Sequence, residues 1–171
     1  MYINWAHFYV PKVFAVLSYL LNPLFIVIVL RNTKLLLGNY RYLLTFFAIL
    51  NMLSSLCDVL VPMSVHNYRY AFSVFVSDGI FLKLTDYSEI VLGVRCGFIS
   101  ATYAILHAHF LYRFLVIHDD GFLRKYFIPY GLITVAWYCL FTMTYWGLCL
   151  VIFLTPNQSR RIYMRDSMHE A

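Results

Sequence analysis

Few side chains in this sequence are suited to catalysis or metal binding, and most of those few lie inside long apolar stretches. His107 and His109 are two positions apart, which places them about 200° apart on a helix, so they cannot bind one metal ion together. No glycine-rich phosphate loop, Ser-His-Asp set or pair of carboxylates is recognisable. We therefore expect each histidine to be packed or hydrogen-bonded, and we expect no enzyme, no metal site and no cofactor.

Asp58 and Arg95 are charged residues inside apolar sequence, and their positions predict a common depth in a membrane. Each lies about one helical turn from the outer end of its apolar stretch. An isolated charge in hydrocarbon is unfavourable, and an ion pair that faces the interior of a helix bundle is less so. We predict that the two side chains pair. The alternative is that each one extends separately to the outer interface.

The elements that must position these residues are four long apolar stretches, 13–30, 43–62, 90–117 and 126–154. A helix needs about 20 apolar residues to cross a bilayer, because an unpaired backbone amide in lipid is costly. Hydrophobic residues make up 62% of the chain, charged residues make up 12%, and the mean hydropathy is +0.71. Soluble domains carry about 25% charged residues. The sequence therefore predicts an all-α membrane protein with four transmembrane helices.

The formal net charge of +5 does not indicate a nucleic acid partner. The basic residues lie in short segments beside the apolar stretches and not along one polar face. Tyrosine and tryptophan residues, Tyr40 among them, gather near several ends of the stretches, where amphipathic rings anchor at headgroup depth. The expected partner is therefore the lipid bilayer with its anionic headgroups.

The charge of the loops orients the four stretches. Segments 31–42 and 118–125 carry basic residues, which favour the cytoplasmic side when a loop is short. Segment 63–89 is richer in acids and is expected to be an outer loop, so the N-terminus and the tail 155–171 are expected outside. Three arginines in this tail favour the opposite side by the same rule: Arg160, Arg161 and Arg165.

Two residue types in the sequence are open to covalent modification. Asn157 begins an Asn-Gln-Ser triplet, which is an acceptor for N-glycosylation and would fit an outer tail, although it lies close to the last apolar stretch and a chance triplet is the alternative. The cysteines lie inside apolar stretches without a CxxC pair, so we expect free thiols. They are Cys57, Cys96, Cys139 and Cys149.

The order of residues is distinctive in several segments beyond its hydrophobicity. Asn22 is followed by an apolar run and then by Arg31-Asn32-Thr33-Lys34, and Cys96-Gly97 is followed by His109-Phe110-Leu111-Tyr112-Arg113-Phe114. Further segments are Gly38-Asn39-Tyr40-Arg41-Tyr42-Leu43-Leu44, Ser54-Ser55, Phe72-Ser73-Val74-Phe75, Trp146-Gly147 and Tyr163-Met164-Arg165-Asp166-Ser167. Together they resemble the nematode seven-transmembrane chemoreceptors of the Str superfamily of serpentine receptors, over almost the whole chain.

This resemblance implies a fold and a function. The four helices would be spans 1–4 of a rhodopsin-like seven-helix receptor, which senses a small odorant and couples to a heterotrimeric G protein. The family implies the plasma or ciliary membrane of sensory neurons. Tyr112 and Arg113 occupy the place where many G-protein-coupled receptors have an acid-Arg-Tyr triplet, so they are the candidate cytoplasmic coupling end. No acid precedes Arg113 here, and the alternative role of Arg113 is a simple topology anchor.

Candidate ligand-facing residues follow only from their depth in the outer halves of the second and third spans and in the outer loop. They are Asn67, Phe98, Thr102 and Tyr103. For each one the alternative is a packing role within the membrane.

In the family the segment after the fourth span leads to three more spans, whereas this sequence ends at Ala171. The resemblance therefore implies a single partial receptor domain over 1–171, truncated and unable to signal alone. The alternative is a four-span, non-signalling membrane protein that acts as a structural or dominant-negative partner of full-length receptors, or in a receptor oligomer. A transporter subunit is less favoured, because the first two spans do not resemble the last two.

Overall fold

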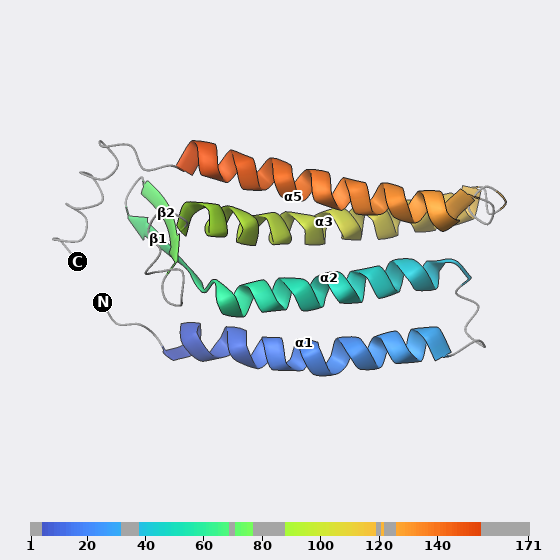
Figure 1. The fold of residues 1–171 in the computed structure, drawn as a ribbon, viewed down its shortest axis with the longest axis horizontal. Helices are drawn as coiled ribbons and strands as arrows, with labels where there is room; N and C mark the ends of the chain where they lie inside the picture. The colour runs from blue at the N-terminus through green and yellow to red at the C-terminus, as the bar shows by residue number, and fades with distance from the viewer. Residues whose placement is uncertain are drawn as a thin grey trace.

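The computed structural model describes residues 5–31, 38–68, 71–76, 88–118, 121 and 126–154. The long helices in this part of the chain are α1 (Trp5–Arg31), α2 (Tyr40–Leu60), α3 (Ser88–His118) and α5 (Leu132–Leu154). They form a row in which α1 packs on α2, α2 on α3 and α3 on α5, and successive helices run in opposite directions (Figure 1). A small β-hairpin lies at the end of the row where α2 ends and α3 begins. We call this the hairpin end, and we call the other the opposite end.

Each of the four helices is long and apolar enough to cross a membrane. The qualifying segments are Tyr9–Arg31, Tyr40–Leu60, Glu89–His118 and Phe127–Phe153. Many of their large hydrophobic side chains are exposed, among them Phe14, Phe110, Phe141 and Phe153. Such surfaces are unfavourable in water but are well accommodated by lipid tails. The prediction of an all-α membrane protein with four transmembrane helices is confirmed, and the hairpin is a small addition to it.

The hairpin consists of strand β1 (Met63–Tyr68) and strand β2 (Ala71–Val76), which pair antiparallel. Its base is the pair Met63 and Val76, close to the end of α2. The hairpin lies within 63–89, for which the sequence predicts an outer loop. Its second strand is a short, mostly apolar run in which Ser73 is the one polar residue, and Val76 at its end is buried.

The helix α5 is preceded by a single π-helical turn, η3 (Phe127–Gly131). Within this turn Ile128 has extended backbone angles, with φ −113° and ψ 120°. The residue before a proline is disfavoured in the helical region because the proline ring crowds its backbone, and Pro129 follows here. The regular helix therefore begins only at Leu132, inside the stretch 126–154.

Small residues let α3 and α5 approach closely. A Cβ atom placed on Gly93 would lie 3.1 Å from the carbonyl oxygen of Gly147, so the two backbones are in near contact. About two turns further along α3, Ser100 Oγ donates a hydrogen bond across the interface to the carbonyl oxygen of Thr142, at 3.1 Å. Close packing of this kind, with polar contacts, is what drives helix association in lipid.

The contact between α2 and α3 is less extensive than the contacts within the pairs α1–α2 and α3–α5. We call this α2–α3 contact the seam. The larger buried core cluster lies along it and extends to the start of α5. Its members are Leu43, Leu50, Ala101, Ala104, Ile105, Phe127 and Cys139. The row is thus two closely packed helix pairs joined by a thinner interface.

Candidate functional site

At the hairpin end of the seam, Asp58 of α2 and Arg95 of α3 form an ion pair between Asp58 Oδ1 and Arg95 Nη1. The Arg95 side chain is 14% exposed and the Asp58 side chain is 37% exposed, so the arginine is the more buried partner. Arg95 Nε is also buried and has no hydrogen-bond partner among the residues that the structure describes. The structure therefore brings together the two charged residues whose common depth we noted in the sequence.

A small apolar cluster lies at the same end of the seam as the ion pair. Cys57 and Val61 at the end of α2 and Val76 at the end of β2 form a buried cluster. Val91 and Phe98 of α3 pack against it, one turn to either side of Arg95. Arg95 thus lies on α3 between two residues that pack on the hairpin base, and its low exposure makes its electrostatic interactions stronger than in bulk solvent.

The four candidate ligand-facing residues differ in their surroundings. Phe98 is half-buried against the hairpin base. The Thr102 hydroxyl donates to the carbonyl oxygen of Phe98 within its own helix, at 3.1 Å. Tyr103 is 70% exposed. Asn67 lies in β1 opposite Phe72, and its side chain falls outside the described part of the structure. Phe98 is therefore the candidate that packs on the hairpin base, one turn from Arg95.

An aromatic cluster occupies the opposite end of the seam. Tyr40 of α2 stacks on Tyr112 of α3 with ring centroids 4.9 Å apart, and its hydroxyl is hydrogen-bonded to His109 Nδ1 at 3.0 Å. Phe47 approaches His109 edge to face at 5.4 Å, and Phe127 approaches Tyr112 in the same way at 4.7 Å. The cluster therefore joins α2, α3 and the turn before α5.

Local sequence explains why these rings meet. His109 and Tyr112 are three positions apart and share one face of α3, and Tyr40 and Phe47 are seven apart and share one face of α2. Gly38, with φ +50°, turns the chain into the start of α2 in a conformation that favours glycine. The aromatic spacing was available in the sequence as a signal, but only the pairing of α2 with α3 makes it a cluster.

Arg113 lies beside this cluster, at the end of α3. Its guanidinium carbon is 5.9 Å from the centre of the Tyr40 ring, which is the geometry of a cation–π contact. Arg113 itself is exposed, whereas Tyr112 is half-buried in the cluster. The pair Tyr112 and Arg113 thus presents one packed side chain and one accessible charge at the opposite end of the bundle.

The two histidines of α3 contact different helices. His109 contacts Tyr40 of α2, whereas His107 Nδ1 is 3.1 Å from the hydroxyl of Tyr138 on α5. This divergence agrees with their separation by two positions, and each has a hydrogen-bonded role. In the described part of the chain no three His, Cys, Asp or Glu side chains gather in a way that could hold a metal ion.

Polar contacts in the middle of the bundle connect α1 to α2. The Ser55 hydroxyl donates to Ser18 Oγ at 2.9 Å, and Asn22 Nδ2 donates to the same oxygen at 2.8 Å. One turn away, the Tyr19 hydroxyl donates to the carbonyl oxygen of Met52 at 3.0 Å. Hydrogen bonds between helices satisfy polar groups that lipid cannot. These contacts give α1 a defined position although most of its surface is exposed.

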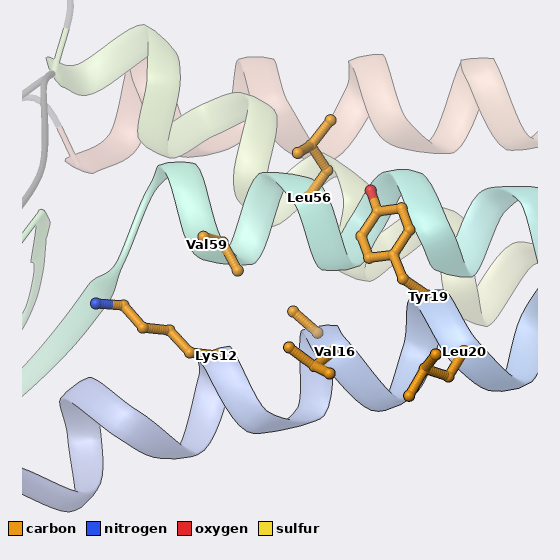
Figure 2. Close-up of a pocket in the computed structure, with 7 residues that line it drawn as sticks. Lys12, Val16, Tyr19, Leu20, Leu56 and Val59 are labelled. Atoms are coloured by element: carbon orange, nitrogen blue, oxygen red, sulfur yellow. The ribbon is translucent and has the colours of Figure 1, made fainter.

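Beside these contacts, α1 and α2 enclose an open groove of about 400 Å³ (Figure 2). The groove is lined by Lys12, Ala15, Val16, Tyr19, Leu20, Leu56 and Val59. Figure 2 shows the Tyr19 ring reaching from α1 toward α2, where its hydroxyl makes the bond to Met52. A ligand site needs a few convergent polar groups, and this lining is almost wholly apolar. We therefore interpret the groove as a surface that contacts lipid tails.

The remaining predicted sites concern covalent modification. Cys57, Cys96, Cys139 and Cys149 are all free thiols, and Cys57 and Cys139 are buried. Asn157 lies outside the described residues.

Comparison with known proteins places the chain in a family. The family model described as serpentine type 7TM GPCR chemoreceptor Srj matches residues 1–171. The chain is 35% identical over 173 residues to Serpentine receptor class J-38 of Caenorhabditis elegans, a match that covers 96% of this chain and 52% of that protein. It is 26% identical over 149 residues to G-protein coupled receptor str-33 of the same organism, with 87% and 43% covered.

No solved structure matches the chain significantly. The chain spans about half the length of the curated relatives it matches. The resemblance to nematode serpentine receptors is confirmed. The members of this family are receptors and not a class of enzymes. With four membrane-crossing helices and a family match along its whole length, the chain belongs to the serpentine 7TM chemoreceptors of the Srj family.

Proposed function

We propose that this chain forms the first four spans of a chemoreceptor that binds a small odorant at the hairpin end and signals to a heterotrimeric G protein at the opposite end. The observation that carries this proposal is the match of the Srj family model to residues 1–171. Because the chain spans about half the length of its relatives, signalling is proposed for a receptor that contains this chain and not for these four spans alone.

The proposal includes an orientation. The N-terminus, the hairpin and the tail 155–171 lie outside, and the loops 31–42 and 118–125 lie in the cytoplasm. Basic residues at the opposite end support this choice, including Arg31 at the end of α1 and Arg41 at the start of α2. The receptor class supports a location in the plasma or ciliary membrane of sensory neurons.

At the outer end, Asp58 and Arg95 with the adjacent Phe98 are the core of the proposed ligand site. An ion pair beside an aromatic ring offers both charge and apolar surface, which is the usual composition of a small-molecule site. Asn67, Thr102 and Tyr103 are secondary candidates. Arg113 at the cytoplasmic end is the proposed G-protein contact, because it is exposed while its neighbour Tyr112 is anchored in the aromatic cluster.

The test is a chimeric receptor in which this chain replaces the corresponding half of the J-38 relative. Cells that express the chimera are exposed to a defined panel of short-chain alcohols, ketones, esters and carboxylates, and G-protein activation is recorded. We expect at least one compound to give a dose-dependent signal, which Arg113→Ala abolishes without loss of surface expression. Arg31→Ala, at the same end but on α1, is the matched control and should retain the signal. A well-expressed chimera that responds to no compound, or an Arg113 variant that signals normally, would contradict the proposal.

A further inference from the structure

Arg95 has more hydrogen-bond donors than its partner uses. A guanidinium group carries five N–H donors in a planar fork and cannot be deprotonated in a protein. Asp58 meets this fork through one carboxylate oxygen at Nη1, and Nε remains buried without a hydrogen-bond partner in the described part of the chain. A buried donor without an acceptor is unfavourable, so among the described residues Arg95 is incompletely satisfied.

The two partners of the ion pair are not equally free to move. Asp58 is 37% exposed and lies in the last turn of α2, so its carboxylate can turn toward water at the membrane boundary. Arg95 is 14% exposed and lies about two turns inside α3, between Val91 and Phe98, which pack on the hairpin base. When the pair separates, the arginine therefore stays in the site and the aspartate leaves it.

A small free carboxylate fits this arginine better than Asp58 does. Arginine and carboxylate groups bind most strongly when two parallel N–H···O bonds form. Asp58 is fixed to α2 and engages through a single oxygen, whereas a free molecule can rotate to present both. Val91 and Phe98, one turn to either side of Arg95 on α3, are only half-buried and offer an apolar surface for a short aliphatic tail.

We infer that this site binds a small organic carboxylate on Arg95, in competition with Asp58. The inference rests on the proposed function for its biological meaning, because it names the ligand class of the same site. It gives Asp58 the role of an internal competitor, which occupies the arginine in the absence of ligand and is displaced by it. Competition has a directional consequence, since removal of the aspartate carboxylate must strengthen binding.

The experiment uses the chain 1–171 in phosphatidylcholine nanodiscs, with hexanoate as the probe and hexanamide as the neutral control of the same length. Binding is followed by the Arg Nε–H signals in NMR spectra of the ¹⁵N-arginine-labelled protein and by thermal unfolding. We expect a saturable shift of one Nε–H signal with hexanoate only. Asp58→Asn should raise the affinity for hexanoate about tenfold. The variant removes the competing carboxylate, whose contact with Arg95 is comparable to one good charge-assisted hydrogen bond. Arg95→Gln should lose the response.

Several results would overturn the inference. These are an equal response to hexanamide, an unchanged or weaker hexanoate affinity in Asp58→Asn, or an unchanged affinity in Arg95→Gln. If Arg95→Gln does not fold, the Asp58→Asn variant decides the question, because its folded fraction should rise with hexanoate and not with hexanamide. Nanodiscs that contain phosphatidylserine test a lipid headgroup as the source of the anion. If anionic lipid abolishes hexanoate binding at constant ionic strength, the headgroup is the occupant and the inference is wrong.

This experiment fails separately from the test of the proposed function. A chimera that signals with neutral odorants while hexanoate leaves the Arg95 signal unchanged would keep the receptor function and refute the carboxylate site. Hexanoate binding to the chain together with a silent chimera would keep the carboxylate site and refute the proposed receptor function.

Discussion

A methyl group added at Gly97 should weaken the packing of α3 on α5. A Cβ atom at this position would lie 2.9 Å from the carbonyl oxygen of Met143 and 2.8 Å from its Cγ. The carbonyl oxygen belongs to the backbone of α5 and cannot turn aside, so the helices must separate by a few tenths of an ångström. Overpacking of this kind costs about 1–3 kcal/mol. Separation would also stretch the Ser100–Thr142 hydrogen bond, worth about 0.6 kcal/mol in a membrane protein.

The expected change in stability on Gly97→Ala is opposite in sign to the change that helix propensity predicts. Alanine is favoured over glycine inside a helix by up to about 1 kcal/mol, so the loss from overpacking must exceed this gain. We expect Gly97→Ala to lower the free energy of unfolding by about 2 kcal/mol. Gly93→Ala should cost less, because its nearest contact at 2.9 Å is a methyl group of the Val151 side chain, and its nearest backbone contact, the Gly147 carbonyl oxygen, is 3.1 Å away. Gly147→Ala should cost least, because its nearest contact, the Gly93 carbonyl oxygen, is 3.2 Å away.

The assay is reversible unfolding in mixed dodecylmaltoside and dodecyl sulfate micelles, followed by circular dichroism. Leu148→Ala is the matched control, because this side chain is 55% exposed and lies beside Gly147 on the same helix. Its effect should stay within about 0.5 kcal/mol. If Gly97→Ala leaves the stability unchanged or raises it, or if Gly147→Ala is the most damaging of the three, the close approach of α3 and α5 is wrong.

Three further outcomes are expected. Reversal of either charge in the Asp58–Arg95 pair should lower the yield of folded protein in fluorescence-detected gel filtration, and the double reversal should restore it, unless the two side chains act independently. Tyr40→Phe should cost about 0.6 kcal/mol by removing the hydrogen bond to His109 while keeping the ring stack, and a double-mutant cycle with His109→Phe should show non-additivity of that size. Asn157→Gln should increase electrophoretic mobility in a glycosylating cell line if the tail is outside, and no change in mobility would speak against a modified outer tail.

The sequence was sufficient for the membrane-crossing elements because bilayer thickness sets their length. The helices α1 and α3 nevertheless extend past their apolar stretches at both ends. α1 begins at Trp5 and not near residue 13, since Pro11 and Lys12 are acceptable in a helix that continues beyond the hydrocarbon. The common depth of Asp58 and Arg95 could also be counted along the two helices, and depth was enough to anticipate that they meet.

Depth does not give the direction in which a side chain points. Tyr103 has the depth expected of a ligand-facing residue, but its position around the helix axis leaves it 70% exposed in the described structure. Phe98 has a similar depth and turns toward the hairpin base. The same limit applies to Tyr40, for which the sequence predicted only an interfacial anchor. Its contacts with His109 and Tyr112 depend on which helices are neighbours, which no single helix encodes.

The seam between α2 and α3 has a mechanical consequence. It is the thinnest of the three interfaces in the row, and it carries the ion pair at one end and the aromatic cluster at the other. When two rigid bodies share one narrow contact, relative rotation about that contact disturbs less packing than any other motion. The buried residues Leu50 and Ile105, between the two ends, are the expected pivot. We expect that separation of Asp58 and Arg95 would tilt α3 against α2 about this pivot. This tilt would change the position of Arg113, which lies about 27 Å from Arg95 along α3.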